Sequence, residues 1–316
     1  MLLMVILAIA ALWIFGAREP VDRDISFDPA SLPANLDEYL AQSEAQVENL
    51  NPDVARRIIW AGGVGETTPL SIVYLHGFSA TSEEIRPVPD RVAEAVGANL
   101  YFARLAGHGR NGAAMAEGSA GDWLEDTAEA LAIGRRIGDE VILIGASTGG
   151  TLAAIAATDP ELSESVKGVI FVSPNFEIAN RLAALLTWPY ARSWLPPILG
   201  RERSFAPQND RHARYWTTRY PSVAVFPMAA LVRHARKLDY DAATLPALFV
   251  FSDDDQVVKA ATTRSIIEKW AGPVEIENPA LTEADDPDAH VITGDILSPN
   301  QTEPAIGRMT RWIEGL

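Results

Sequence analysis

The stretch that decides the fold is Val141–Thr158, which reads Val-Ile-Leu-Ile-Gly-Ala-Ser-Thr-Gly-Gly-Thr-Leu-Ala-Ala-Ile-Ala-Ala-Thr. Its first four residues form the apolar, β-branched run of a buried strand, and the residues after Gly149 have the composition of a helix. Between them, Gly145-Ala146-Ser147-Thr148-Gly149 fits the pattern Gly-x-Ser-x-Gly. A strand that enters a helix through one serine predicts a sharp, strained turn, where flanking glycines avoid clashes.

Such a turn raises the Ser147 hydroxyl above the sheet and sets it beside the N-terminus of the following helix. The first N–H groups of a helix have no partner within it, so they can stabilise a developing negative charge. We therefore expect Ser147 to be a nucleophile and the Thr148 N–H to be one donor of an oxyanion hole. The alternative is a tight strand–helix turn with an idle serine.

The rest of the chain alternates apolar, β-branched runs with amphipathic stretches, which is typical of a mostly parallel sheet covered by helices on both faces. The expected strands are Arg57–Ala61, Ser71–Leu75, Asn99–Arg104, Val141–Gly145, Gly168–Val172, Ala247–Phe251 and Val274–Glu277. The expected helices are Leu36–Val47, Ser82–Val96, Ala120–Ile137, Gly149–Thr158, Ala260–Trp270 and Glu303–Ile313.

One interval, about residues 175–244, is too long for a simple crossover and predicts an insertion. It is rich in leucine and tryptophan although it lies outside the sheet. These side chains can cap a cleft at the carboxyl ends of the strands as a helical lid, or form a small core of the insertion itself, or do both.

A serine nucleophile needs a base with a pKa near neutrality, and the chain has five histidines. His290 follows the last expected strand and can fold back to Ser147, so we expect it to be the general base. His108, in a glycine-flanked loop, is the main rival and is otherwise expected to shape the cleft wall. His212 and His234 belong to the insertion, where a solvated or capping role is expected.

The third member of the expected catalytic set is a carboxylate at the end of Ala247–Phe251, where Asp253, Asp254 and Asp255 stand in a row. It would accept the histidine Nδ1–H and stabilise the imidazolium. Asp255 is preferred because two valines follow it and can pack the loop onto the sheet. The roles of the other two stay open, and an acid from elsewhere in the chain is the alternative.

A second oxyanion donor is expected after the strand Ser71–Leu75, where His76-Gly77-Phe78 stands. The Phe78 N–H is the candidate, and loss of one such donor typically costs about 10²–10³-fold in rate. His76 is interpreted as structural, its ring holding the loop by hydrogen bonds.

The N-terminal segment, residues 1–17, begins with fifteen uncharged residues and is interpreted as an uncleaved membrane anchor or a signal segment, with a helix packed onto the domain as the alternative. Residues 18–33 are expected to be a linker and 34–316 the main domain. This interpretation predicts a membrane-anchored protein with its catalytic domain on the periplasmic or extracytoplasmic side, the cytoplasmic face being possible.

Composition excludes several classes of protein. A net charge of −16 would repel nucleic acid, and the absence of cysteine excludes disulfides, thiolate metal sites and a cysteine nucleophile. Nothing in the sequence indicates an oligomeric state.

The order Ser147, Asp255, His290 with these elements resembles the α/β-hydrolase superfamily, in particular its carboxylesterase, monoacylglycerol lipase and lysophospholipase-like branch. The resemblance implies a central sheet of about eight strands, a lid insertion, no metal and no organic cofactor. It also implies a serine hydrolase that cleaves esters of unhindered carboxylic acids through an acyl-enzyme. The apolar insertion suggests that the substrate is an acyl-chain lipid or a similar small apolar ester. An acyltransferase, an amidase or a perhydrolase would use the same triad, and a non-catalytic, membrane-tethered binding scaffold is the alternative from another class.

Overall fold

The computed structural model describes Met4 and residues 11–316. At its centre is a seven-stranded sheet of order β1-β3-β2-β4-β5-β8-β9, in which only β1 runs antiparallel to its neighbour. The strands are β1 (Arg57–Ile59), β2 (Thr68–Leu75), β3 (Asn99–Phe102), β4 (Gly138–Ala146), β5 (Val166–Val172), β8 (Ala247–Val250) and β9 (Val274–Glu277). The expected α/β class is confirmed, with seven strands in place of about eight.

The count is lower because upstream of β2 only the short β1 pairs with the sheet, whereas the chain before it forms a helix and extended segments. All seven expected strands are present. The ends of the expected helices agree with the observed ones to within a few residues, except that the helix expected at Ser82–Val96 starts at Val88. The helices are α2 (Leu36–Ala45), α3 (Val88–Val96), α4 (Ala120–Ile137), α5 (Thr148–Thr158), α6 (Ala191–Leu199), α7 (Asp210–Tyr215), α8 (Val225–Ala235), α9 (Ala260–Ile267) and α10 (Thr302–Glu314).

Alternate residues of the central strands feed two hydrophobic cores, one on each face of the sheet. In β2, Val73 and Leu75 join the core that includes α4, α5 and α8, while Ile72 and Tyr74 join the core beneath α3 and α10. All four side chains are fully buried. Because successive side chains of a strand point to opposite faces, a parallel sheet covered on both sides needs such continuous apolar strands.

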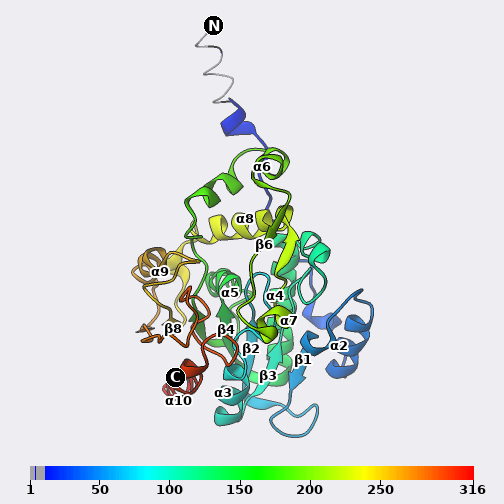
Figure 1. Cartoon of the computed structure of the whole chain (residues 1–316). Coiled ribbons are helices and arrows are strands. Elements are labelled where there is room, and N and C mark those ends of the chain that lie inside the picture. Colours follow the sequence, from blue (N-terminus) through cyan, green and yellow to red (C-terminus); the bar gives the residue numbers. More distant parts are fainter. Residues whose placement is uncertain (1–3, 5–10) are drawn as a thin grey trace.

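The expected insertion lies between β5 and β8 and contains α6, α7 and α8 together with a small antiparallel ribbon, β6 (Glu202–Ser204) and β7 (Arg219–Pro221). In Figure 1, α6 and α8 lie on the side of the molecule where the described N-terminal residues also lie. Helix α8 contacts α5 and buries Phe226 and Leu231 in the core of the main domain. The insertion is therefore anchored on the helix that follows the Gly-x-Ser-x-Gly turn.

The predicted N-terminal anchor falls mostly on residues 1–3 and 5–10, which lie outside the described residues. The described helical residues 11–15 end near the insertion: the rings of Trp13 and Trp188 are 5.1 Å apart, and the Tyr190 N–H donates to Ala17 O. Nowhere in Met4 and residues 11–316 is there a helix with both the length and the apolar character needed to cross a bilayer. This finding overturns the predicted membrane-anchored location and gives no support to a membrane partner.

The segment expected to be a linker runs along α4. The N–H groups of Ser26 and Phe27 donate to the two carboxylate oxygens of Glu125, at 2.6 and 2.9 Å. Val21, Ile25 and Phe27 also pack against the core. Residues 18–33 thus contribute apolar surface to the main domain.

Candidate active site

The turn at Ser147 has the strained geometry that its sequence predicts. Ser147 has φ +47° and ψ −111°, in the left-handed half of the backbone map that non-glycine residues seldom occupy. A Cβ added to Gly145 would lie 2.5 Å from Gly149 O, and one added to Gly149 would lie 2.0 Å from Leu75 O. Both glycines are therefore required by close backbone contacts, as expected from the motif.

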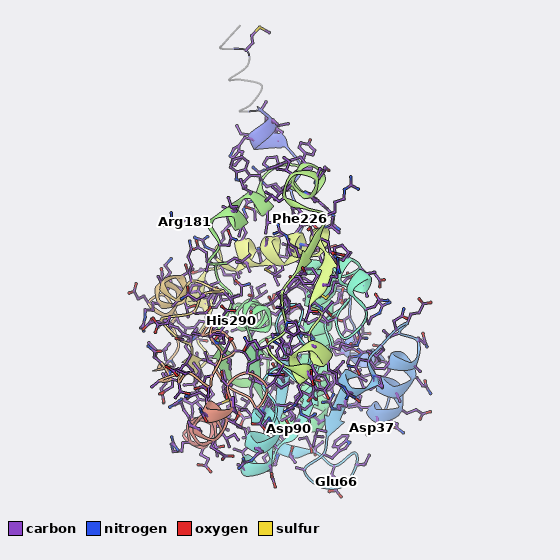
Figure 2. The ribbon with its side chains drawn as sticks, in the orientation of Figure 1. Asp37, Glu66, Asp90, Arg181, Phe226 and His290 are labelled. Atoms are coloured by element: carbon purple, nitrogen blue, oxygen red, sulfur yellow. The ribbon has the colours of Figure 1, made fainter. Side chains whose placement is uncertain are left out.

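Three residues that are far apart in the sequence meet at the carboxyl ends of the strands. His290 Nε2 lies 3.0 Å from Ser147 Oγ, and His290 Nδ1 lies 2.8 Å from Asp255 Oδ2. Ser147 follows β4, Asp255 follows β8, and His290 follows β9. In Figure 2, His290 lies between the sheet and the insertion that carries Phe226, while Glu66, just before β2, lies at the opposite end.

Asp255 is the only one of the three consecutive aspartates that faces the histidine. Its side chain is 1% exposed, and its Oδ1 accepts the N–H groups of Val257 and Val258 at 2.8 and 2.9 Å. Asp253 and Asp254 are exposed, and Asp253 forms a bidentate ion pair with Arg264. The turn that holds Asp255 thus directs its neighbours to the surface.

The loop carrying His290 is fixed by a second aspartate. Asp286 Oδ2 accepts the N–H groups of His290 and Val291 at 3.1 and 2.9 Å. Burial lowers the pKa of His290, but the charge and hydrogen bond of Asp255, together with the charges of Glu84 and Asp286, outweigh burial, so the net pKa is raised above its usual value. Asp286 had no expected role, although an aspartate four residues before the candidate histidine is a signal for a side chain that closes a loop.

The loop after β2 is held by the ring of His76. Gly77 O accepts hydrogen bonds from His76 Nδ1 at 2.9 Å and from the Ala80 N–H at 3.3 Å, while His76 Nε2 accepts the Leu105 N–H at 3.1 Å. Burial lowers the pKa of His76 to about 3, so the ring is neutral. A neutral ring with its proton on Nδ1 can make both of these hydrogen bonds. Because the C=O and N–H of a peptide unit point in opposite directions, fixing Gly77 O also fixes the direction of the Phe78 N–H.

The two expected oxyanion donors, Phe78 and Thr148, both lie near the nucleophile. Phe78 lines the cavity that contains Ser147, and Thr148 is the first residue of α5, whose N–H has no acceptor within the helix. Within the described part of the chain, neither N–H donates to another group. Both are therefore free to bind an oxygen atom of a ligand.

Sequence reasoning missed Glu84, a buried carboxyl in the same cavity. Its Oε2 accepts the Gly77 N–H at 2.7 Å and the Tyr74 hydroxyl at 3.0 Å. Burial raises the pKa of Glu84, against the opposing effects of the Gly77 N–H and of His290. A Cβ on Gly77 would lie 2.6 Å from Glu84 Oε1 and 3.1 Å from Ser147 Cβ, so the loop passes between these two side chains.

Of the five histidines, His290 is the one whose ring contacts Ser147 Oγ, although His212 lines the same cavity. His108 Nδ1 lies 3.1 Å from Ala106 O, and its buried ring packs edge-on against Phe78 and Trp123. Burial lowers the pKa of His108 to about 4, which keeps it uncharged behind Phe78, the residue that lines the cavity. His212 is buried rather than solvated: it lines the same cavity as Ser147, and its Nδ1 accepts the Gln208 N–H at 3.1 Å. Its own N–H is capped by Asn209 at the start of α7, and His234 lies near the end of α8.

A cavity of about 390 Å³ opens onto Ser147 and His290. Its walls come from the loop after β2 and from the insertion, including Tyr220 and Met228. A second, mainly apolar cavity of about 290 Å³ shares Ile178, Tyr220 and Met228 with it and is lined further by Leu186, Leu195 and Val225. Across Met4 and residues 11–316, no group of three or more His, Asp and Glu side chains is arranged to hold a metal ion.

A comparison with known families identifies the family to which the chain belongs. Residues 68–275, more than half of the chain, match the family model Hydrolase_4, described as serine aminopeptidase, S33. The chain belongs to this family of hydrolases. The matched region begins at β2 and includes Ser147 and Asp255, while His290 lies beyond its end.

Individual relatives point to the same branch. A thermostable monoacylglycerol lipase from Bacillus sp. (strain H-257) is 27% identical over 194 residues, which cover 61% of this chain and 73% of the lipase. Together with the family match, this relative confirms the predicted family and enzyme class, an α/β-hydrolase of the lipase and esterase type.

Solved structures share the fold at low identity. One is a metagenome-derived lipolytic enzyme from the study of LipS and LipT (TM-score 0.69, 20% identity, covering 84% of this chain and 100% of that one). Another is the monoacylglycerol lipase of Paleococcus ferrophilus (TM-score 0.58, 16% identity, covering 82% and 98%). These likenesses support the α/β-hydrolase fold.

Proposed function

We propose that the chain is a serine hydrolase of carboxylic esters in which Ser147 is the nucleophile, His290 the general base and Asp255 the residue that orients the histidine. The observation that carries the proposal is the continuous chain of contacts from Asp255 Oδ2 through the imidazole to Ser147 Oγ, at 2.8 and 3.0 Å. Nucleophile, base and orienting acid at hydrogen-bond distance are the signature of an activated serine.

In the proposed reaction, Ser147 Oγ attacks the ester carbonyl carbon while His290 Nε2 takes the hydroxyl proton. The N–H groups of Phe78 and Thr148 stabilise the negative charge that develops on the carbonyl oxygen. The C–O bond to the alcohol then breaks, and the imidazolium gives its proton to the departing alcohol. Water, deprotonated by His290, cleaves the acyl-enzyme and restores Ser147.

The substrate we propose has an apolar acyl chain. The insertion supplies Tyr220, Met228 and Ile178 to the walls of both the catalytic cavity and the neighbouring apolar cavity, so a chain bound at Ser147 can extend beneath the insertion as under a lid. The similar Bacillus protein is a monoacylglycerol lipase, which is in keeping with an acyl-chain ester.

The test is a series of nitrophenyl esters from acetate to palmitate, assayed with the wild-type protein and with Ser147→Ala. We expect kcat/KM to rise with acyl length beyond acetate and to fall to background in the variant. A strict preference for acetate would contradict the acyl-chain part of the proposal, and an unchanged rate in Ser147→Ala would contradict the nucleophile.

The description of the family favours amide hydrolysis at a substrate N-terminus as the second candidate, because an amidase uses the same triad. Aminoacyl nitroanilides, assayed beside the esters with the same two proteins, separate the two functions. Turnover of the anilides at rates equal to those of the esters would replace the ester proposal. Transfer of the acyl group to an added alcohol or to hydrogen peroxide, in preference to water, would indicate an acyltransferase or a perhydrolase.

A further inference from the structure

A cavity outside the active site has an unusual charge for this molecule. It measures about 540 Å³ and lies between the start of the insertion, the end of α8 and the start of α9. Five cationic side chains line it, and one carboxylate, that of Glu177, faces them. The cationic residues are Arg181, Arg233, Arg236, Lys237 and Lys259. The protein as a whole has a net charge of −16, so this local excess of positive charge stands against the overall balance.

The carboxylate of Glu177 already has partners on this chain. The Glu177 carboxylate forms an ion pair with Lys259. Its Oε2 accepts the Thr262 hydroxyl at 2.8 Å and lies 3.2 Å from Arg236 Nη2. Its charge can therefore neutralise only part of the cluster. In Figure 2, Arg181 is seen on the insertion, apart from His290.

The remaining cations lack an acidic partner. Among the described residues, Arg181 and Lys237 form no ion pair or side-chain hydrogen bond, and Arg233 donates only to the main-chain Thr187 O at 3.3 Å. Arg181 and Lys237 are exposed to solvent at the cavity rim. Like charges that gather around one hollow repel each other, and a bound anion removes that cost.

We infer that this cavity is a binding site for a small, multiply charged oxyanion of the phosphate type, either free or as the head group of a larger molecule. Arginine forks suit the geometry of phosphate oxygens, and lysine adds point charge. The site is separate from the proposed catalytic machinery, since Ser147, Asp255 and His290 are absent from its walls. It also reaches the loop of the catalytic acid, because the Lys259 N–H donates to Glu177 O and the Ala179 N–H donates to Val257 O.

Isothermal titration calorimetry with inorganic pyrophosphate at low ionic strength tests the site. The variant Arg181→Gln/Lys237→Gln removes two unpaired cations, and Arg91→Gln/Lys167→Gln removes two charges from α3 and from the amino end of β5 as a matched control. We expect wild type and control to bind alike, and the cavity variant to bind more weakly by roughly fivefold per charge removed. Added salt should weaken binding by the wild type.

A second titration with monomeric dihexanoyl phosphatidic acid distinguishes the source of the phosphate. Tighter binding of the lipid than of pyrophosphate would assign the site to a head group, and the reverse would assign it to a free anion. The inference is wrong if the folded wild type binds neither probe, or if the cavity variant and the control lose affinity equally. A thermal melt of each variant shows whether it is folded.

Discussion

Asp255 differs from Asp253 and Asp254 in the partners of its two carboxylate oxygens. Oδ2 contacts His290, while Oδ1 accepts two main-chain N–H groups of the residues that follow. A carboxylate with both oxygens engaged keeps its orientation, and this is what a histidine needs to hold its tautomer. The two exposed neighbours have no such contacts with the site.

Replacing Asp255 with Asn should therefore reduce kcat by about 10³–10⁴-fold, because the histidine loses its tautomeric control and the charge that stabilises the imidazolium. Asp253→Asn and Asp254→Asn are the matched controls, each changing one oxygen of an adjacent side chain. They should keep nearly full activity in the ester assay. Near-normal activity of Asp255→Asn would show that the acid comes from elsewhere.

The raised pKa of His290 sets the direction of the pH dependence. A general base must be unprotonated, so kcat/KM should rise with pH along an ascending limb whose midpoint lies above the pKa of a free imidazole, about 6.5. Asp255→Asn should move the midpoint of the residual activity to lower pH, because Asp255 is the first of the carboxylates that oppose the effect of burial on the pKa of His290. A midpoint below that of free imidazole in the wild type would contradict the assignment.

We expect Glu84 to affect the proposed reaction through the Gly77 peptide. Its carboxyl accepts the Gly77 N–H, and His76 holds the carbonyl of the next peptide unit, so together they set the path of the backbone that presents the Phe78 N–H. Since Glu84 does not contact a reacting atom in this scheme, we regard it as a positioning residue.

Glu84→Leu should lower kcat by about 10²-fold with little change in KM, similar to the loss of one oxyanion donor. Glu84→Gln keeps an oxygen that can accept the Gly77 N–H and should restore most of that loss. A purely structural role would lower the melting temperature of Glu84→Leu without this split between kcat and KM.

At the level of elements, the turn between β4 and α5 is the most constrained junction of the fold. It places a non-glycine residue at φ +47° and brings Gly149 into contact with β2. The strain is maintained because β4 pairs with β2 and β5 on its two sides, so the strand end cannot shift.

Gly149→Ala should therefore destabilise the protein by at least about 3 kcal/mol, since the new methyl group would overlap the main chain at Leu75. Gly62→Ala is the control: its Cβ would meet only the flexible Glu66 side chain, at 3.0 Å. Denaturant unfolding measures both variants. Equal stabilities would show that the turn relaxes easily.

Much of this arrangement could be predicted from the sequence, because apolar β-branched runs and glycine-flanked turns are local signals. The helix expected to start at Ser82 is the exception, since α3 starts at Val88. Pro87 lacks an N–H and disfavours helical geometry in the residue before it, so residues 82–87 form turns. These turns bring Glu84 back to Gly77, a contact that no helical periodicity could have indicated.

The described part of the molecule consists of a sheet that presents three side chains at the carboxyl ends of its strands and an insertion that contributes walls to the cavity beside them. Sequence order alone could suggest that Ser147 and His290 meet, because parallel strands place their carboxyl ends together. It could not show which walls the insertion contributes, since Met228 lies on α8, which packs on α5, and Tyr220 lies on the ribbon of β6 and β7. The N-terminal interpretation preferred a membrane anchor, whereas the contact between Trp13 and Trp188 is in keeping with its alternative, a helix packed onto the domain.

The most direct measurement is covalent labelling of the purified full-length protein with a fluorophosphonate, followed by mass spectrometry of the modified peptide. Ser147→Ala and His290→Ala serve as folded comparisons. The proposed triad predicts one adduct, on Ser147, that forms rapidly in the wild type, slowly in His290→Ala and not at all in Ser147→Ala. An adduct on another residue, or no adduct on a folded wild-type protein, would contradict it.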